Sequence, residues 1–212
     1  MTTATFDDDL DLVLRDRRLL EHPFYRRWER GEVSTEELAS YAAQYRHFEE
    51  FLPKYLARLV AVLPDGPTRE LVAANLADEL GDPVPHVEMF GRFAHAVGAT
   101  EEPPSSAIAQ LLKTYEDLLS ESPAAALAGF VAYESQSSGI AQTKAAGLRR
   151  DHGLSEYEVS FWTHHAEIDV RHGEWARHAV DAIAGDPNEL RDAARRAADA
   201  WWAFLDEREL AA

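Results

Sequence analysis

The apolar residues of this chain recur at intervals of three and four positions over most of its 212 residues. This spacing places them on one face of an α-helix, which has 3.6 residues per turn. The sequence contains no runs of alternating Val, Ile and Thr bounded by hairpin turns, the pattern typical of β-strands. The pattern therefore predicts an all-α protein without strands.

Prolines, glycines and capping residues divide this pattern into about eight helices. Two sequences of the form S-x-x-E, Ser34 with Glu37 and Ser155 with Glu158, have the composition of capping boxes and predict helix starts. Proline lacks an amide hydrogen, so it marks a start or a disturbance within a helix. The predicted helices cover residues 6–30 with a disturbance at 22–23, 34–63 with a bend near Pro53, 67–80, 86–98, 108–119, 124–150, 155–184 and 187–206.

A single domain, residues 1–212, accounts for the whole chain. One hydrophobic core can still cover this length. The hydrophobic share of 46%, which includes five Trp, is sufficient for a packed interior. There is no internal repeat of fixed period and no low-complexity linker, so we expect one compact helical bundle.

The charge balance bears on partners and location. The net charge of −17 repels nucleic-acid phosphates and anionic lipid surfaces, so neither is an expected partner. No run of about eighteen apolar residues is present, and the start of the chain lacks the basic and then apolar layout of a secretory signal. We therefore expect a cytoplasmic protein.

Cysteine is absent, so any metal site must use histidine and carboxylate ligands. His165, Asp169 and His172 are spaced i, i+4 and i+7, which places all three on one face of a helix. Two imidazoles and one carboxylate suit iron, manganese or zinc and leave open positions for oxygen. The alternative is a solvated helical face, since these residue types are common on surfaces.

Three further residues favour the metal site when taken together. Glu79 and His86 lie on either side of a predicted helix junction, because the glycine and prolines between them interrupt one regular helix. Glu134 stands in an otherwise apolar stretch, where a buried charge requires a partner. Taken singly, each has a commoner explanation: an exposed position for Glu134, and a local helix-start contact for His86.

The order of these residues, Glu-x6-His, then Glu, then His-x3-Asp-x2-His, resembles the ligand set of the haem-oxygenase-like di-metal oxidases. The resemblance implies a haem-oxygenase-like bundle, as in TenA-like and PqqC-like proteins. It also implies two metal ions, Fe/Fe or Fe/Mn, which react with dioxygen and need an external reductant. The implied metal ligands are Glu79, His86, Glu134, His165, Asp169 and His172.

Four stretches are similar to one branch, the group named for the chlamydial protein associating with death domains. They are residues 22–31, 38–45, 133–136 (Tyr-Glu-Ser-Gln) and 143–148 (Thr-Lys-Ala-Ala-Gly-Leu). Members of this group are self-sacrificing para-aminobenzoate synthases. The resemblance implies that Tyr25 supplies the aromatic ring, that Lys144 donates the nitrogen, and that Tyr133 passes an electron and a proton during oxygen activation.

The alternatives for these residues are ordinary structural ones. Tyr25 is otherwise a core aromatic beside Pro23 and Trp28, and Lys144 a solvated surface lysine. The surface alternative for Lys144 is weakened because the chain has three lysines and uses arginine elsewhere. Glu134 and Lys144 would lie about 15 Å apart along an unbroken helix, so we expect a break or bend at residues 135–139.

Two other functions remain open at the level of sequence. A sister oxidase would use the same metals on an external small molecule such as an amino acid or fatty acid. A metal-holding interaction protein would use the ligands for storage or stability. A thiaminase-like activity is disfavoured because that chemistry uses a cysteine nucleophile. A homodimer is expected, both from the prevalence of two-fold oligomers and from the family resemblance.

Overall fold

The computed structural model describes residues 6–81, 84–168, 179–180, 183 and 185–211. Within these ranges the regular structure is helical and contains no strand, which confirms the all-α prediction. The elements are α1 (Phe6–Leu14), η1 (Leu19–Glu21), α2 (Pro23–Glu29), α3 (Thr35–Val62), α4 (Pro67–Leu80), α5 (His86–Ala96), α6 (Ser106–Glu121), α7 (Pro123–His152) and α9 (Pro187–Leu210). A further helical stretch covers residues 160–168.

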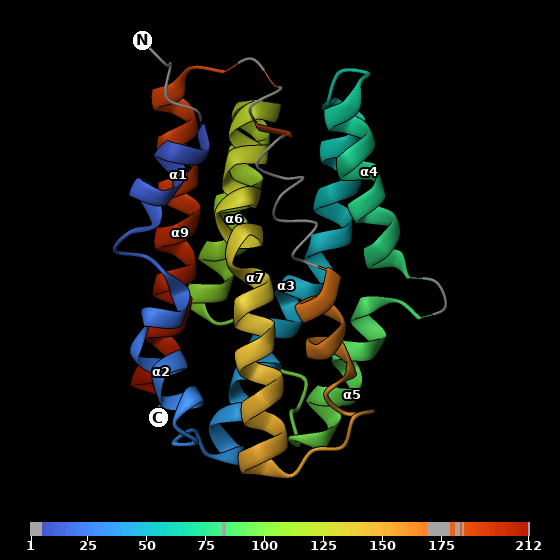
Figure 1. Ribbon diagram of the computed structural model, residues 1–212, viewed down its shortest axis with the longest axis vertical. Helices are drawn as coiled ribbons and strands as arrows, with labels where there is room; N and C mark the ends of the chain where they lie inside the picture. Colours follow the sequence, from blue (N-terminus) through green and yellow to red (C-terminus); the bar gives the residue numbers. More distant parts are fainter. Residues whose placement is uncertain (1–5, 82–83, 169–178, 181–182, 184, 212) are drawn as a thin grey trace.

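Helix α7 runs through the middle of the bundle. It packs against α9, α6, α2 and α3. In Figure 1, α1, α2 and α9 form one side of the molecule and α4 with α5 the other, with α7 between them. Eighteen residues of α7 are buried, so this helix joins the two sides and can present side chains to both.

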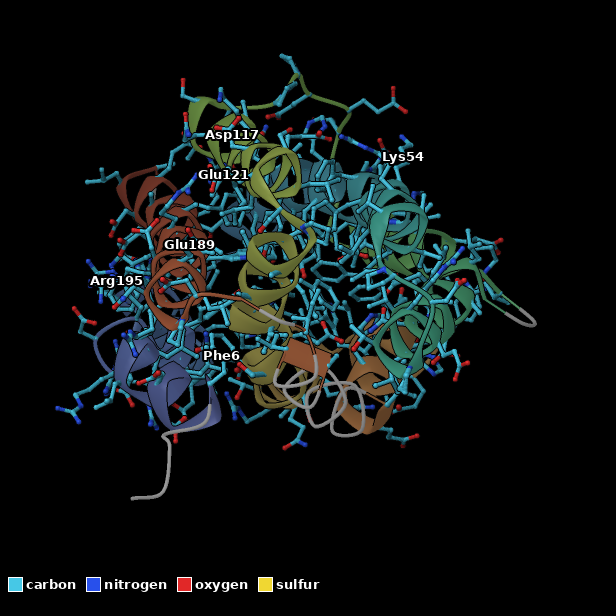
Figure 2. The ribbon with its side chains drawn as sticks, turned by 90° about the horizontal axis from the view of Figure 1, so that it is seen from above. Phe6, Lys54, Asp117, Glu121, Glu189 and Arg195 are labelled. Carbon is cyan, nitrogen blue, oxygen red and sulfur yellow. The ribbon has the colours of Figure 1, made fainter. Side chains whose placement is uncertain are left out.

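Aromatic side chains fill the interior. Tyr41, Tyr45 and Phe48 project from α3, and Trp201 packs against Phe48 with ring centroids 4.6 Å apart. Figure 2 shows the labelled charged side chains, among them Lys54, Asp117 and Glu189, at the periphery of the bundle. The acidic excess therefore lies mostly outside an apolar core. None of the helices in the described part of the chain combines the length with the apolar composition that a membrane span needs.

The capping residues act largely as predicted. The Ser34 hydroxyl accepts a hydrogen bond from the Glu37 amide, and the Glu37 carboxylate accepts one from the Ser34 amide, so this capping box is confirmed. The Ser155 amide likewise donates to the Glu158 carboxylate at 2.7 Å, but residues 156–159 form a turn and the helix begins at residue 160.

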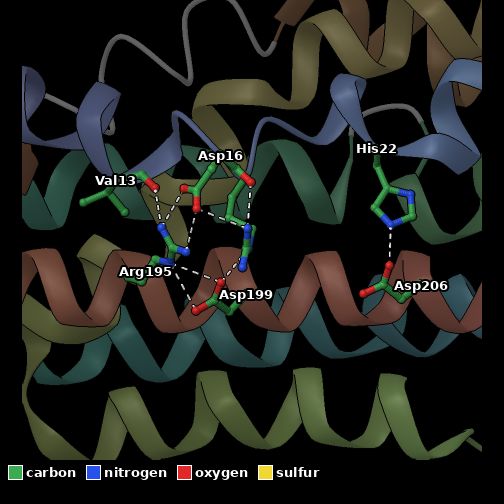
Figure 3. Close-up of polar contacts among 7 residues, drawn as sticks. Val13, Asp16, His22, Arg195, Asp199 and Asp206 are labelled. Carbon is green, nitrogen blue, oxygen red and sulfur yellow. Dashed lines mark hydrogen bonds and ion pairs between the residues drawn. The ribbon is translucent and has the colours of Figure 1, made fainter.

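The prediction of one N-terminal helix with a disturbance at 22–23 is wrong, because α1 already ends at Leu14. Side chains of other helices bind the segment that follows. Arg17 Nε donates to the Asp199 carboxylate of α9 at 2.6 Å, and the Leu19 amide donates to the Gln136 side chain of α7 at 2.8 Å. Figure 3 shows the ion pairs of this region, in which Arg195 joins Asp16 to Asp199. These tertiary contacts replace helical hydrogen bonds.

The predicted break at residues 135–139 is also wrong, because α7 continues unbroken from Pro123 to His152. Serine and glycine are poor helix formers, but burial of the helix outweighs that preference. The side chains also find local partners. Ser137 Oγ donates to the Glu134 carbonyl at 2.7 Å, and Ser138 Oγ donates to the Ala166 carbonyl at 3.0 Å.

Candidate metal centre and tyrosine-lysine cage

Three side chains of the kinds that bind metal ions lie where α4 ends and α5 begins, and we call them the metal cluster. Glu79 lies one residue before the end of α4, His86 is the first residue of α5, and His165 comes from the stretch 160–168. Gly81 makes the turn between the helices, with φ of +69°, and a Cβ there would lie 2.1 Å from the Val84 carbonyl oxygen. The backbone at Gly81 therefore requires glycine, and Glu79 and His86 flank the helix junction as predicted.

The donor atoms of this cluster are arranged as metal ligands are. One ligand atom each from Glu79, His86 and His165 lies within 4.8 Å of the others. His86 Nδ1 is buried, makes no hydrogen bond, and lies 3.1 Å from Glu79 Oε2. His165 Nδ1 lies 2.9 Å from the Phe161 carbonyl oxygen, and Nε2 lies 3.8 Å from Glu79 Oε1. Imidazole nitrogens that converge on a carboxylate in this way fit a shared cation.

The electrostatics of Glu79 agree with this geometry. Burial raises the pKa of its carboxyl, but the contacts with His165 and His86 outweigh burial and bring the pKa down to about 2. Glu79 is therefore a carboxylate at neutral pH although its exposed fraction is 6%. A buried anion beside two imidazoles is a suitable donor set for a divalent ion.

Glu134 lies close to this cluster but outside its three-donor group. It is buried on α7 and accepts a hydrogen bond from Asn75 Nδ2 at 3.3 Å. Asn75 is one helical turn before Glu79 on α4, so the two carboxylates approach the same region from two helices. Asp169 and His172, the remaining predicted ligands, lie outside the described residues.

A second polar cluster lies between α2, α3 and α7. Lys144 Nζ donates to the Tyr41 hydroxyl at 2.6 Å, and the Tyr41 and Tyr25 hydroxyls are 3.1 Å apart. The amine is also surrounded by rings, with Nζ 3.9 Å from the centroid of Trp162 and 5.0 Å from that of Tyr25. We call Tyr25, Tyr41, Tyr45, Lys144 and Trp162 the cage.

The cage is closed to solvent. The exposed fractions of Tyr25, Tyr41 and Lys144 are 2%, 0% and 1%. Burial lowers the pKa of the Lys144 amine well below its usual value, and the opposing attraction of Glu49 is smaller. Burial also raises the pKa of the Tyr25 phenol. Burial thus disfavours the charged form of the amine and of the phenol alike.

A glycine of α7 and the cap of α2 position the two helices that carry Lys144 and Tyr25. Gly147 lets α7 approach α2, since a Cβ there would lie 2.8 Å from Trp28 Cδ1. His22 Nδ1 accepts a hydrogen bond from the Phe24 amide and so caps α2, the helix of Tyr25. His22 Nε2 lies 3.0 Å from Asp206 of α9, as Figure 3 shows. These contacts fix the start of α2 and hence the phenol.

Tyr133 connects the cage with the neighbourhood of the metal cluster. Its hydroxyl lies 2.5 Å from the Tyr45 hydroxyl, and it precedes Glu134 in α7. Tyr45 is also in hydrogen-bonding contact with Glu49, whose Oε2 is buried without a partner. Burial, with repulsion from Glu79, raises the pKa of the Glu49 carboxyl to about 8.

The sequence analysis did not identify the three polar residues that α3 contributes to the cage and its surroundings. Tyr41, Tyr45 and Glu49 are spaced i, i+4 and i+8, so they share one face of the helix. That spacing was visible in the sequence, but a tyrosine and a glutamate at helical intervals are usually read as an ordinary amphipathic face. Trp162 was missed for the same reason, three positions before His165 on the same turn.

Comparison with known proteins places the chain among redox proteins. The sequence pattern of a family described as iron-containing redox enzyme matches residues 39–204. A 4-aminobenzoate synthase of Chlamydia muridarum is 31% identical over 212 residues, with 96% of this chain and 90% of that protein covered. A 4-aminobenzoate synthase of Nitrosomonas europaea is 34% identical over 227 residues, with 97% and 92% covered.

The fold has solved counterparts as well. The crystal structure of a TenA homologue from Pseudomonas syringae superimposes with a TM-score of 0.84 and covers 97% of this chain and 93% of its own. The identity is 16%, so this likeness speaks for the fold alone. It confirms the expected haem-oxygenase-like, TenA-like bundle.

Proposed function

This chain belongs to the family of iron-containing redox enzymes, and we propose that it makes 4-aminobenzoate from its own Tyr25. In this proposal Tyr25 supplies the ring, Lys144 supplies the nitrogen, and a di-metal centre with dioxygen and an external reductant drives the oxidation. Both relatives described above are 4-aminobenzoate synthases, and they align with nearly the whole chain.

One observation carries the proposal: the lysine amine is linked to the oxygen end of the tyrosine ring. Lys144 Nζ is hydrogen-bonded to the Tyr41 hydroxyl, which in turn contacts the Tyr25 hydroxyl. In 4-aminobenzoate the nitrogen occupies the ring carbon that bears the phenol oxygen in tyrosine. The amine therefore lies near the carbon that must receive it, and burial, which lowers the pKa of the amine, favours its nucleophilic form.

The burial of the cage supports an internal substrate. Tyr25, Tyr41 and Lys144 have almost no exposed surface, so an external molecule would reach the amine only after the helices separate. Lys144 and Tyr25, both hydrogen-bonded to Tyr41 and 5.0 Å apart from amine nitrogen to ring centroid, need no such opening. Their fixed geometry also removes the entropic cost of bringing ring and nitrogen together.

The metal centre is proposed to use Glu79, His86 and His165, joined by Glu134, Asp169 and His172. Iron, or iron with manganese, bound there would supply the one-electron steps with dioxygen that organic side chains do not provide. The chain's own contribution is to hold the donors deprotonated, as Glu79 is, and to keep water away from the cage. Nitrogen and carboxylate donors fit both Fe/Fe and Fe/Mn pairs.

The test needs no added substrate. Metal-free protein is loaded with Fe(II), with or without Mn(II), and exposed to oxygen and a reductant. Product and intact protein mass are then quantified. We expect at most about one 4-aminobenzoate per chain, with mass lost at Tyr25, and no product from Tyr25→Phe or Lys144→Arg.

The controls are exposed residues of the same types. Tyr157, with 64% of its surface exposed, and Lys113, which pairs with Asp117 on the surface, are replaced by Phe and Arg and should leave the yield unchanged. Oxygen consumption with intact Tyr25 and no product would contradict the proposal and favour an oxidase for an external substrate. Metal binding without oxygen consumption would favour a metal-holding protein.

A further inference from the structure

We propose that a cavity between the segment before α2 and the middle of α7 binds a small aromatic carboxylate such as 4-aminobenzoate. The choice of ligand rests on the proposed function and deepens it, because it gives the product a site outside the closed cage. The cavity has a volume of about 330 Å³. Small-molecule sites have volumes of roughly 300–1,000 Å³, so a molecule of the size of benzoate fits there.

The cavity lies next to the two helices that carry the reactive residues of the cage. Five residues of its lining supply the chemistry of the site: Leu14, Arg18, Leu20, Ser135 and Gly139. Leu20 is in η1, which leads directly into α2, the helix of Tyr25. Gly139 and Lys144 are both in α7, about 7.5 Å apart along the helix axis. A product formed in the cage would therefore reach this cavity by a short path.

Arg18 provides a positive charge that no described acidic group neutralises. Its neighbours in this region form ion pairs, Arg17 with Asp199 and Arg195 with Asp16. The Arg18 side chain forms no hydrogen bond or ion pair with the described residues, although the chain has 38 acidic and 21 basic residues. A guanidinium binds a carboxylate through two parallel N–H groups, so this charge favours a carboxylate ligand.

The two acidic residues that also line the cavity have interactions of their own. Glu21 forms an ion pair with Arg26 of α2, and Arg26 Nε also donates to the Glu21 carbonyl at 3.2 Å. Asp11 likewise takes part in an interaction. Among the described charged groups of the lining, Arg18 is therefore the one available to a ligand.

Ser135 provides a hydrogen-bond donor at the α7 side of the cavity. Its Oγ is buried and has no hydrogen-bond partner in the described part of the chain. The nearby serines of α7 are paired: Ser137 Oγ donates to the Glu134 carbonyl and Ser138 Oγ to the Ala166 carbonyl. A buried hydroxyl without a partner is costly, and a ligand carboxylate in the cavity would accept its hydrogen bond.

The apolar part of the lining suits an aromatic ring. Leu14 is buried, but 37% of the surface of Leu20 is exposed. A ring in the cavity would remove this apolar surface from water, which is favourable. Gly139 keeps the space open: a Cβ there would lie 3.5 Å from Leu20 Cδ1, so any longer side chain would occupy part of the cavity.

The chemistry of the product explains why such a site is needed. In the proposed function a carboxylate forms inside a closed, mostly aromatic cage, where an anion without a partner is costly. The net charge of −17 does not attract an anion to the surface of the protein. An arginine without a counter-charge beside the cage can receive the carboxylate as the product leaves.

The test titrates full-length, Mn(II)-loaded protein with 4-aminobenzoate under argon, so that no oxidation occurs, and measures binding by calorimetry. We expect one molecule per chain. Arg18→Gln should weaken binding at least about tenfold, because a charge-assisted hydrogen bond is lost, and Ser135→Ala should weaken it about threefold or more. Aniline, which has the ring without the carboxylate, should bind at least about tenfold more weakly than 4-aminobenzoate.

Two controls separate this site from general attraction by surface charge. Arg15→Gln removes an exposed arginine that does not line the cavity, and it should bind 4-aminobenzoate like the wild type. Gly139→Met adds a side chain within the cavity and should weaken binding at least about tenfold. Gly139→Ala, which only brings a methyl group into contact with Leu20, should bind nearly as well as the wild type.

The outcomes distinguish failure of the site from failure of the proposed function. No binding, or equal binding in wild type and Arg18→Gln, would overturn the site, and the latter result would place the ligand elsewhere, for example on the metal ions. Weaker binding in Arg18→Gln with no change in Gly139→Met would also overturn it. Binding that depends on both residues would support the site even if the protein made no 4-aminobenzoate with oxygen, a result that would count against the proposed function alone.

Discussion

The metal cluster and the cage both lie between helices, but their buried polar atoms are paired in different ways. In the cluster, carboxylate and imidazole atoms face one another and His86 Nδ1 lacks a hydrogen-bond partner. In the cage, the Lys144 amine and the Tyr25 and Tyr41 hydroxyls form hydrogen bonds with one another. The cluster thus gathers groups that a cation can bind, whereas the amine and the two hydroxyls of the cage bind one another and the Trp162 indole nitrogen makes no hydrogen bond.

In the proposed function this difference separates two chemical tasks. The cluster leaves donor atoms available for a metal, while the cage holds the substrate tyrosine and the amine away from water. The two regions share their supports. The stretch 160–168 carries both Trp162 of the cage and His165 of the cluster, and α7 carries both Lys144 and Glu134. Variants that change one region test whether the metal cluster and the cage act independently of each other.

The largest expected effect is at the cluster, on replacing Glu79 by Gln. The shape is kept, but the carboxylate charge beside His86 and His165 is lost. Loss of an outer partner of a metal ligand already costs roughly 10–100-fold in affinity, so we expect Mn(II) to bind at least about 100-fold more weakly. Titration calorimetry on metal-free protein measures this affinity.

The control for this variant is Glu70→Gln, an exposed glutamate on the same helix. It should bind Mn(II) like the wild type. Near-ultraviolet circular dichroism, which reports on the buried aromatic rings, should not change in either variant. Equal Mn(II) affinity in Glu79→Gln and wild type would show that the cluster is not the metal site.

The next largest effect is at the cage, on replacing Lys144 by Met. The amine has a lowered pKa in the folded protein and a pKa near 10.5 when unfolded. Between these two values the unfolded chain binds more protons, so wild-type stability rises with pH in that window. We expect Lys144→Met to be more stable at pH 7 by roughly 1–3 kcal/mol, with a gain that shrinks toward pH 10.

Urea unfolding at several pH values measures this gain. Lys113→Met is the control, because Lys113 is exposed and its pair with Asp117 contributes little. It should change stability by less than about 0.5 kcal/mol at each pH. A destabilised Lys144→Met whose deficit is the same at every pH would mean that the amine is charged in the folded protein.

The predictions from sequence succeeded where the signal was local. The cap at Ser34 and the turn at Gly81 follow from short-range backbone requirements, and both are found. The end of α1 at Leu14 was not predictable, because it depends on Asp199 and Gln136, distant in the sequence. Glu49 was missed for a related reason: its burial follows from the packing of α3, not from its neighbours in the chain.

Glu49 lies between the two regions, and it gives the smallest and most specific prediction. Its carboxyl interacts with Glu79 and His165 on one side and with Lys144 on the other. In metal-free protein the folded-state pKa is raised from 4.5 to about 8. The folded protein then binds more protons than the unfolded chain between these values, so this stabilising contribution is full below about pH 4.5 and is lost as the pH rises through 8.

Glu49→Gln removes this titration. We expect the variant and the wild type to be equally stable near pH 5, and the variant to be more stable by about 1–2 kcal/mol at pH 8.5. Glu50→Gln, at the exposed neighbouring position, should show no such trend. A cation bound at Glu79 would attract the Glu49 carboxylate and lower its pKa, so Mn(II) should reduce the difference at pH 8.5. If Mn(II) left the difference unchanged, the two regions would be electrostatically independent and Glu49 would not connect them.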